Sequence, residues 1–219
     1  MYKYIINFII LLSVFTLLSC QKSKEANSDV DDKSYISNFE LLQQNSTKDT
    51  SIRITSPKAI IDPTNNFIEV FNSSIEIINK MGQDIYINSG KSSFNNSKNL
   101  ITVFNDVDIS LSGDNNTFIK THSFYWDMNT SNINLNSPLD INFNNSTLTS
   151  SHGSYNIDSS QLDLSNNVFK KSFFNLKGKE LYQIQIISDN AKWLKSHNSI
   201  EFLSNNKQVE TTINFLSVK

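Results

Sequence analysis

The sequence predicts an all-β fold, and two observations carry that prediction. From Ser51 onward apolar residues alternate with polar ones, and asparagine pairs interrupt the alternation at intervals. Alternation gives a strand one apolar and one polar face, and such strands belong to antiparallel sheets rather than to parallel sheets covered on both sides. The alternating groups include Ile52/Ile54, Ile75/Ile77, Ile101/Val103, Ile133/Leu135, Leu139/Ile141/Phe143 and Leu162/Leu164.

Asparagine takes the place of glycine at the predicted turns. The chain has only 5 glycines, but asparagine tolerates the left-handed backbone region and hydrogen-bonds its own backbone. Turns are therefore predicted at Asn65-Asn66, Asn95-Asn96, residues 113–116, Asn144-Asn145, Asn166-Asn167 and Asn205-Asn206.

The first twenty residues predict export and a lipid anchor. Lys3 precedes an apolar run at 5–18, which is shorter than the ~20 residues that a membrane-spanning helix needs and fits a signal peptide. The run ends in Leu17-Leu18-Ser19-Cys20, which resembles the lipobox of bacterial lipoproteins, and Cys20 is the only cysteine. We expect residues 1–19 to be a signal peptide and Cys20 to carry the lipid; an uncleaved anchor helix is the alternative.

The segment after Cys20 predicts a tether. Residues 21–34 are polar and charged, which is typical of a flexible linker. Ile36, Phe39 and Leu42 have helical spacing, so one or two helical turns are expected over 35–44. The predicted organisation is a lipidated tether over 20–50 and one β domain over 51–219.

An internal repeat organises the predicted domain. Five anchor residues each follow an apolar residue by two positions and an aromatic or aliphatic residue by nine. A lone hairpin cannot bury its apolar face, whereas stacked units form one continuous core. The anchors are Val70, Val103, Leu135, Leu164 and Phe202; two before them stand Ile68, Ile101, Ile133, Leu162 and Ile200; nine before them stand Ile61, Phe94, Trp126, Tyr155 and Trp193.

Two of these units resemble the OstA-like repeat of the lipopolysaccharide-transport proteins. The pattern appears in Lys91-Ser92-Ser93-Phe94-Asn95 with Asn99 to Val107, and again from Gly153 to Val168. The resemblance covers about residues 50–215, and the N-terminal anchor with one domain of this size is most similar to the LptC members of the OstA/LptA/LptC superfamily.

The resemblance implies an open, V-shaped antiparallel β-jelly roll built from repeated hairpin units. It implies a non-enzymatic component of lipopolysaccharide export in the periplasm, anchored to the inner membrane. Acyl chains of lipopolysaccharide would lie between the sheets, against Ile101, Val103, Ile133, Leu135, Ile141, Phe143, Leu162 and Leu164. Whether the two sheets are splayed into such a groove or closed into an ordinary core is left open by the sequence.

The resemblance also implies two docking edges. The first strand, about Ser51 to Thr55 with Ile52 and Ile54, would meet the periplasmic β-domain of an ABC transporter. The last strand, about Thr211 to Leu216 with Ile213 and Phe215, would meet an LptA-like bridge protein. Strand addition at an unpaired edge is the physical basis of both contacts.

Other chemistry is disfavoured. The formal net charge is −2 without a basic stripe, which argues against nucleic-acid binding. No nucleophile elbow or phosphate-binding glycine loop is present, so no enzyme activity and no cofactor are expected. His122, His152 and His197 lack metal-ligand spacing, and Asp106/Asp108 and Asp158/Asp163 suit the wet face of strands better than catalytic pairs. A periplasmic or surface β-repeat lipoprotein that acts as a scaffold or carbohydrate binder is the alternative function.

Overall fold

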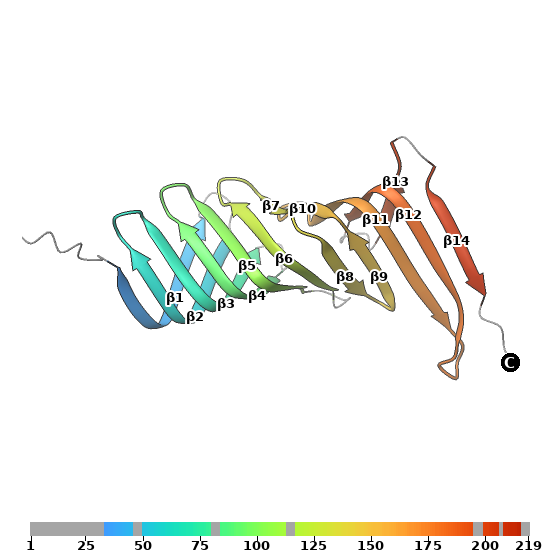
Figure 1. Ribbon diagram of the computed structural model, residues 1–219, viewed down its shortest axis with the longest axis horizontal. Coiled ribbons are helices and arrows are strands. Elements are labelled where there is room, and N and C mark those ends of the chain that lie inside the picture. The colour runs from blue at the N-terminus through green and yellow to red at the C-terminus, as the bar shows by residue number, and fades with distance from the viewer. Residues whose placement is uncertain are drawn as a thin grey trace, which may run out of the picture. The chain divides into compact units, whose positions relative to one another are not determined.

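A computed structural model describes residues 33–45, 50–79, 84–112, 117–194, 199–205 and 208–215. The predicted signal peptide, Cys20 and most of the predicted tether lie outside the described residues. The described part confirms the all-β prediction, because its regular structure consists of fourteen strands in one sheet, paired antiparallel throughout (Figure 1).

The strands are numbered in the order in which they occur in the chain. They are β1 (Ser34–Asn45), β2 (Thr50–Asp62), β3 (Phe67–Asn79), β4 (Asp84–Asn95), β5 (Leu100–Leu111), β6 (Thr117–Asp127), β7 (Asn132–Leu135), β8 (Leu139–Phe143), β9 (Ser146–Ser150), β10 (His152–Asn156), β11 (Gln161–Phe174), β12 (Glu180–Leu194), β13 (Ser199–Leu203) and β14 (Glu210–Phe215).

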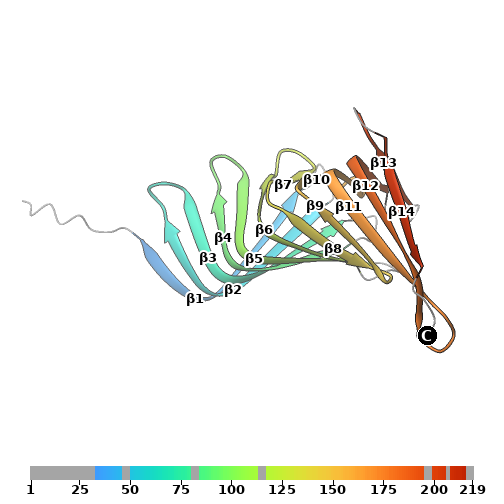
Figure 2. The same cartoon turned by 45° about the vertical axis from the view of Figure 1, so that its right-hand side comes forward.

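Each long strand bends once, so the sheet folds into two arms that face each other (Figure 2). The ladder breaks at the bend: β3 and β4 pair at Phe71↔Lys91 and resume at Ser73↔Ser89, and similar gaps occur between the other long strands. We call this line of breaks the crease.

The crease divides the strands between two arms. The first arm holds 39–45, 50–56, 73–79, 84–89, 107–111, 117–121, β8, β9, 168–174, 180–187 and β14. The second arm holds 34–37, 58–62, 67–71, 91–95, 100–104, 123–127, β7, β10, 161–165, 190–194 and β13.

Left-handed residues mark the crease in β1, β3, β5 and β11. Asn38, Asn72 and Asn166 have φ of 54°, 50° and 55°, and in β5 both Asn105 and Asp106 are left-handed. Such a residue interrupts the pleat, and asparagine adopts this conformation at lower cost than most side chains. Successive inward residues are two apart within an arm and three apart across the crease, both in strands with a left-handed residue and in strands without one, except in β5, where Val103 and Val107 are four apart. The pairs separated by three are Ser56/Ala59, Val70/Ser73, Ser89/Ser92, Thr121/Phe124, Leu164/Asn167 and Ser188/Ala191, all buried.

Buried serine hydroxyls form hydrogen bonds at the crease, where the strand-to-strand backbone pairing is interrupted. Ser56 Oγ lies 2.6 Å from the Phe71 carbonyl oxygen and accepts hydrogen bonds from the backbone N–H groups of Lys58 and Phe71. Ser73, Ser89 and Ser92 form a closed triangle with Oγ–Oγ distances of 2.9, 2.7 and 2.9 Å. Because unpaired buried polar groups are costly, these small side chains make the bend compatible with an apolar interior.

The five repeat units are successive hairpins of the second arm. In every unit, the residue nine before the anchor lies directly opposite the residue two before it. These pairs join across neighbouring units into one row: Ile61↔Ile68↔Phe94↔Ile101↔Trp126↔Ile133↔Tyr155↔Leu162↔Trp193↔Ile200. The repeat therefore encodes a continuous apolar ridge, as the stacking argument predicts.

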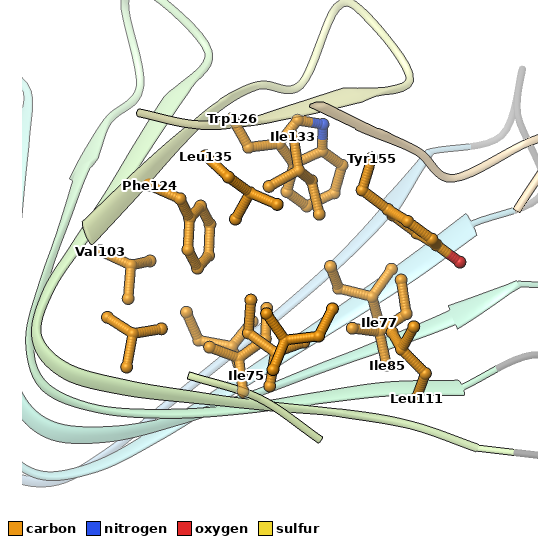
Figure 3. Packing of buried hydrophobic residues seen from close by; sticks show 14 of the residues in the cluster. Ile75, Ile77, Ile85, Val103, Leu111, Phe124, Trp126, Ile133, Leu135 and Tyr155 are labelled. Carbon is orange, nitrogen blue, oxygen red and sulfur yellow. The ribbon is translucent and has the colours of Figure 1, made fainter. Parts of the chain in front are cut away.

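The core lies between the arms. Trp126, Ile133 and Leu135 of the second arm lie across from Ile75 and Ile77 of the first arm (Figure 3). Each of these five side chains is at most 4% exposed.

Two local predictions are wrong. Residues 35–44 form β1, paired with β2 from Ser34↔Ile61 to Asn45↔Thr50, and not a helical turn or a tether. Ile36 lies opposite Ala59 on the inner face and Phe39 is also inward, so their spacing of three is the crease signature rather than a helical period. The sheet thus begins at Ser34, before the expected boundary at residue 51.

The asparagine pairs divide into two kinds. Turns occupy 63–66, 96–99 and 144–145, where asparagine pairs predicted them. Asn166-Asn167, by contrast, lies inside β11 at the crease, and its left-handed residue bends the strand instead of ending it.

Candidate lipid groove and docking edges

The predicted groove residues lie in a closed core. Seven of them are at most 3% exposed, namely Ile101, Val103, Ile133, Leu135, Ile141, Leu162 and Leu164. Phe143 is half-buried and stacks on Trp193 with ring centroids 4.9 Å apart. The structure brings the eight residues to the inner face, and in this middle section each arm packs on the other.

The two arms are offset along the sheet. A small cavity of about 30 Å³ is lined by Gln43, Thr50 and Ile52 from the start of the first arm and by Trp126 and Ile157 from the middle of the second. The first strands of the first arm therefore cover the middle of the second arm. This offset leaves the start of the second arm and the end of the first arm without a partner layer.

The uncovered start of the second arm is aliphatic. Ile36 is 36% exposed, and Ile61 and Ile68 are partly exposed although they belong to the same row as the buried Phe94. The side chains of this row are thus buried in its middle and accessible to solvent at its N-terminal end.

The uncovered end of the first arm is aromatic. Phe173, Tyr182 and Phe215 lie side by side on β11, β12 and β14, with ring centroids 4.5 and 5.9 Å apart. Ile184 and Ile213 form the next row, and Lys171 lies opposite Ile184 with its Nζ 5.3 Å from the Phe173 ring. Phe215 is 79% exposed and Ile213 is 50% exposed. We call these six residues the C-terminal aromatic face.

Three strands have an unpaired side within the described residues. β1 pairs only with β2, and β13 and β14 each pair only with β12, at the C-terminal ends of the second and the first arm. Ile213 and Phe215 therefore lie on an edge strand. Ile52 and Ile54 do not: β2 lies between β1 and β3, and both side chains are in the core, 4% and 1% exposed. The N-terminal edge is β1, which the sequence analysis assigned to the tether.

Tyr155 is the buried titratable group of the interior. Burial raises the pKa of its phenol above the ordinary value, and a hydrogen bond with Ser160 opposes the shift. The neutral phenol is therefore the stable form inside the roll, in keeping with an apolar interior.

The polar candidates do not converge on a site. Among the described residues, no three His, Cys, Asp or Glu side chains gather closely enough to hold a metal ion. Asp158 accepts a hydrogen bond from Ser131, and Asp163 accepts from Gln161. His197 lies outside the described residues. The part of the chain that the structure describes contains no helix with the length and apolarity of a membrane span.

Sequence reasoning missed the C-terminal aromatic face and the β1 edge. Phe173 and Tyr182 lie at the ends of strands that join in a hairpin, outside the registered positions of the repeat. Alternation of Phe169, Lys171 and Phe173 on one strand was the available signal.

Comparison with known proteins gives one family. The model of the family described as "Lipopolysaccharide-assembly, LptC-related" matches residues 4–171, more than half of the chain. A solved structure is similar over 55% of this chain and 86% of its own, with 9% identity and a TM-score of 0.44: LptH, the LptA-homologous periplasmic component of the lipopolysaccharide transport device of Pseudomonas aeruginosa. No curated protein matches.

The family match decides between the two function classes that the sequence left open. The match favours lipopolysaccharide export over a scaffold or carbohydrate binder, and LptC-type proteins are transport components rather than enzymes. Lipopolysaccharide and the Lpt bridge are the partners that the family implies, in the periplasm. The chain belongs to the LptC-related family of lipopolysaccharide-assembly proteins and has a role in lipopolysaccharide transport.

Proposed function

We propose that this chain receives lipopolysaccharide from an inner-membrane ABC transporter at its β1 end and passes it to a periplasmic bridge protein at its β14 end. The offset of the arms carries the proposal. It leaves an apolar inner face uncovered at each end of the roll, next to an unpaired edge strand. A neighbouring roll added to either edge would extend the apolar interior.

Acyl chains would contact the uncovered faces first. Each methylene that leaves water contributes about 0.8 kcal/mol, so several exposed apolar side chains in a row are sufficient to hold a lipid tail transiently. Lys171 stands within the C-terminal aromatic face, where its ammonium would pair with a phosphate of lipid A while Phe173 and Tyr182 contact the acyl chains.

Passage through the middle requires the arms to separate. Ile101, Leu135, Ile141 and Leu162 are buried against the opposite arm, and a lipid chain would have to replace those contacts with its own. The crease is the natural hinge for this opening, because the ladder is already broken there and small hydroxyl groups fill its inner side.

The β14 edge would dock the bridge protein by strand addition. We test this with Ile213→Pro, which removes a backbone donor within the strand, and with Val209→Pro as the control, since Val209 is exposed and precedes the strand. Ile213→Pro is expected to reduce co-purification of the bridge protein while Val209→Pro does not. Equal recovery with both variants would refute docking at β14.

Cys20 would anchor the chain to the inner membrane after cleavage of residues 1–19. Metabolic palmitate labelling tests this directly: Cys20→Ala should lose the label, whereas Ser19→Ala, which keeps a small residue before the cysteine, should retain it. Label that persists in Cys20→Ala would refute the lipid anchor.

A further inference from the structure

The outer face of the second arm carries a row in which lysines alternate with aromatic residues. Lys58, Phe71, Lys91 and Phe104 are successive cross-strand neighbours on β2, β3, β4 and β5. Lys58 Nζ lies 5.5 Å from the Phe71 ring centroid and 5.7 Å from that of Tyr35, and Lys91 Nζ lies 5.4 Å from both Phe71 and Phe104. We call these five residues the aromatic–lysine row. Each ammonium is thus held over ring faces, at a distance suited to cation–π attraction.

The surface around this row mixes large apolar side chains with polar and charged ones. Ile60 and Tyr125 lie on the adjoining outer row with Glu69, Ser93 and Thr102 between them, and Phe67 and Leu100 lie on the next row with Asp62, Asn95 and Asp127. Tyr35 is 67% exposed and Tyr125 is 38% exposed.

The same two rows become mostly polar farther along the arm. They continue from β7 to β13 through Asn134, Ser154, Asp163, Lys192 and Glu201, and through Asn132, Asn156 and Gln161. Large apolar side chains on these two rows are therefore more frequent in the half of the arm that begins with β1.

The charges of this half-face leave one lysine without a carboxylate partner. Lys91 forms an ion pair with Glu69 at 2.8 Å. Asp62 at the end of β2 has a lowered pKa, chiefly through hydrogen bonds from Asn65 and in part through the charge of Lys33. Lys58 makes no ion pair among the described residues, and its ammonium lies over two rings. The half-face combines aromatic side chains with a lysine that has no carboxylate partner within the described ranges, which suits a partner that is apolar beneath an anionic layer.

We propose that the aromatic–lysine row rests on the surface of the membrane, with the aromatic side chains at headgroup depth and Lys58 paired with an anionic phospholipid headgroup. Amphipathic rings and snorkelling lysines are the side chains that suit this depth, and each lysine near an anionic surface adds about 1 kcal/mol. The row is also close to where the described chain begins. Only residues 21–32 separate Cys20 from Lys33, and Tyr35 follows two residues later.

The inference rests on the proposed N-terminal anchor and adds an orientation to it. Twelve residues span at most about 40 Å when fully extended, so an anchored chain would hold β1 within that distance of the membrane surface. Contact through the outer face of the second arm would leave both sheet edges free for docking.

Amine labelling of the full-length chain tests the orientation. The protein is reconstituted into vesicles of phosphatidylcholine and into vesicles of equal parts phosphatidylcholine and phosphatidylglycerol, and lysine reactivity is read by mass spectrometry. Lys58 is expected to react several-fold more slowly in the anionic vesicles, and high salt should reverse part of the protection. Lys120, on the outer face of the first arm with its side chain 66% exposed, is the internal control and should not change.

A pair of charge-reversal variants sharpens the test. Lys58→Glu should abolish the protection of Lys91 in anionic vesicles, whereas Lys170→Glu, an equal charge change at an exposed position of the first arm, should preserve it. Equal reactivity of Lys58 in both vesicles would overturn the proposal, and so would protection that appears only when the transporter is added, because that result would assign the face to a protein partner. In a chain that retains its palmitate label, either result would refute this orientation and leave the anchor standing.

Discussion

Phe94 on β4 lies directly opposite Ile101 on β5, and both side chains are almost completely buried. The same seven-residue spacing joins Trp126 to Ile133 and Tyr155 to Leu162. One hairpin geometry, repeated along the chain, therefore builds the apolar ridge of the second arm, and the ridge becomes accessible at its N-terminal end.

The first prediction distinguishes the buried middle of the ridge from its open end. Ile101→Ala should lower the free energy of unfolding by about 2–5 kcal/mol, because it leaves a cavity between the arms. Ile36→Ala removes the same atoms from a side chain that is 36% exposed, and should cost clearly less. Denaturant titration followed by circular dichroism measures both, and an equal loss would show that the middle is not closed.

The crease gives a second prediction. Ser73→Ala removes one corner of the triangle with Ser89 and Ser92, and should cost about 1 kcal/mol of stability. Ser74→Ala, at the exposed neighbouring position of the same strand, is the control and should be nearly neutral. If both variants unfold at the same denaturant concentration, the buried hydroxyls do not stabilise the bend.

Close packing at Gly153 gives a third prediction. A Cβ at this position would lie 2.7 Å from the Asp163 carbonyl oxygen and 2.8 Å from Leu164 Cδ2. Gly153→Ala should therefore force β10 away from β11 and cost about 1–3 kcal/mol. Ser154→Ala, the next residue on the same strand and on its outer face, should be tolerated. A Gly153→Ala protein as stable as Ser154→Ala would contradict the packing of this hairpin.

The buried phenol of Tyr155 gives a pH dependence. Its pKa in the folded chain lies above the ordinary 10.0, mainly because burial disfavours the phenolate. Its stabilising contribution is complete below pH 10 and is lost as the pH rises through the folded pKa, since the unfolded chain releases the proton first. Tyr155→Phe should flatten the alkaline limb of a plot of unfolding free energy against pH. Superimposable limbs for the two proteins would contradict this assignment.

Much of the fold was predictable because it depends on local periodicity. The two-residue alternation identified the strands, and the spacing of the repeat identified residues that lie opposite each other, such as Trp193 and Ile200. The inward position of the eight groove candidates followed from the same alternation.

The bend of the strands was not predicted, although its signal was present. Ile36/Phe39 and Leu164/Asn167 have a spacing of three, which indicates a helix or a turn when it is considered locally. Only the neighbouring strands, each broken at the same level, give that spacing its meaning. The same limitation of local patterns led to the assignment of β1 to the tether and of β2 to the edge. The strand character of β1 depends on its pairing with β2 and is not evident from the sequence of β1 alone.

The closure of the middle section also depended on tertiary structure. An inward Ile141 has the same sequence pattern whether the arms are closed or splayed, and the offset between the arms decides which positions are covered. The sequence therefore located the apolar face but not the part of it that solvent or lipid can reach.

We propose that this chain moves newly made lipopolysaccharide from the inner membrane toward the outer membrane. The most direct test of this role is to deplete the chain in its native bacterium, pulse-label lipopolysaccharide, and measure the label in separated inner and outer membranes. We expect label to accumulate in the inner membrane and wild-type protein to restore delivery. A Tyr182→Asp/Ile213→Asp variant, altered only at the C-terminal aromatic face, should restore it poorly. Normal delivery to the outer membrane in depleted cells would refute this role.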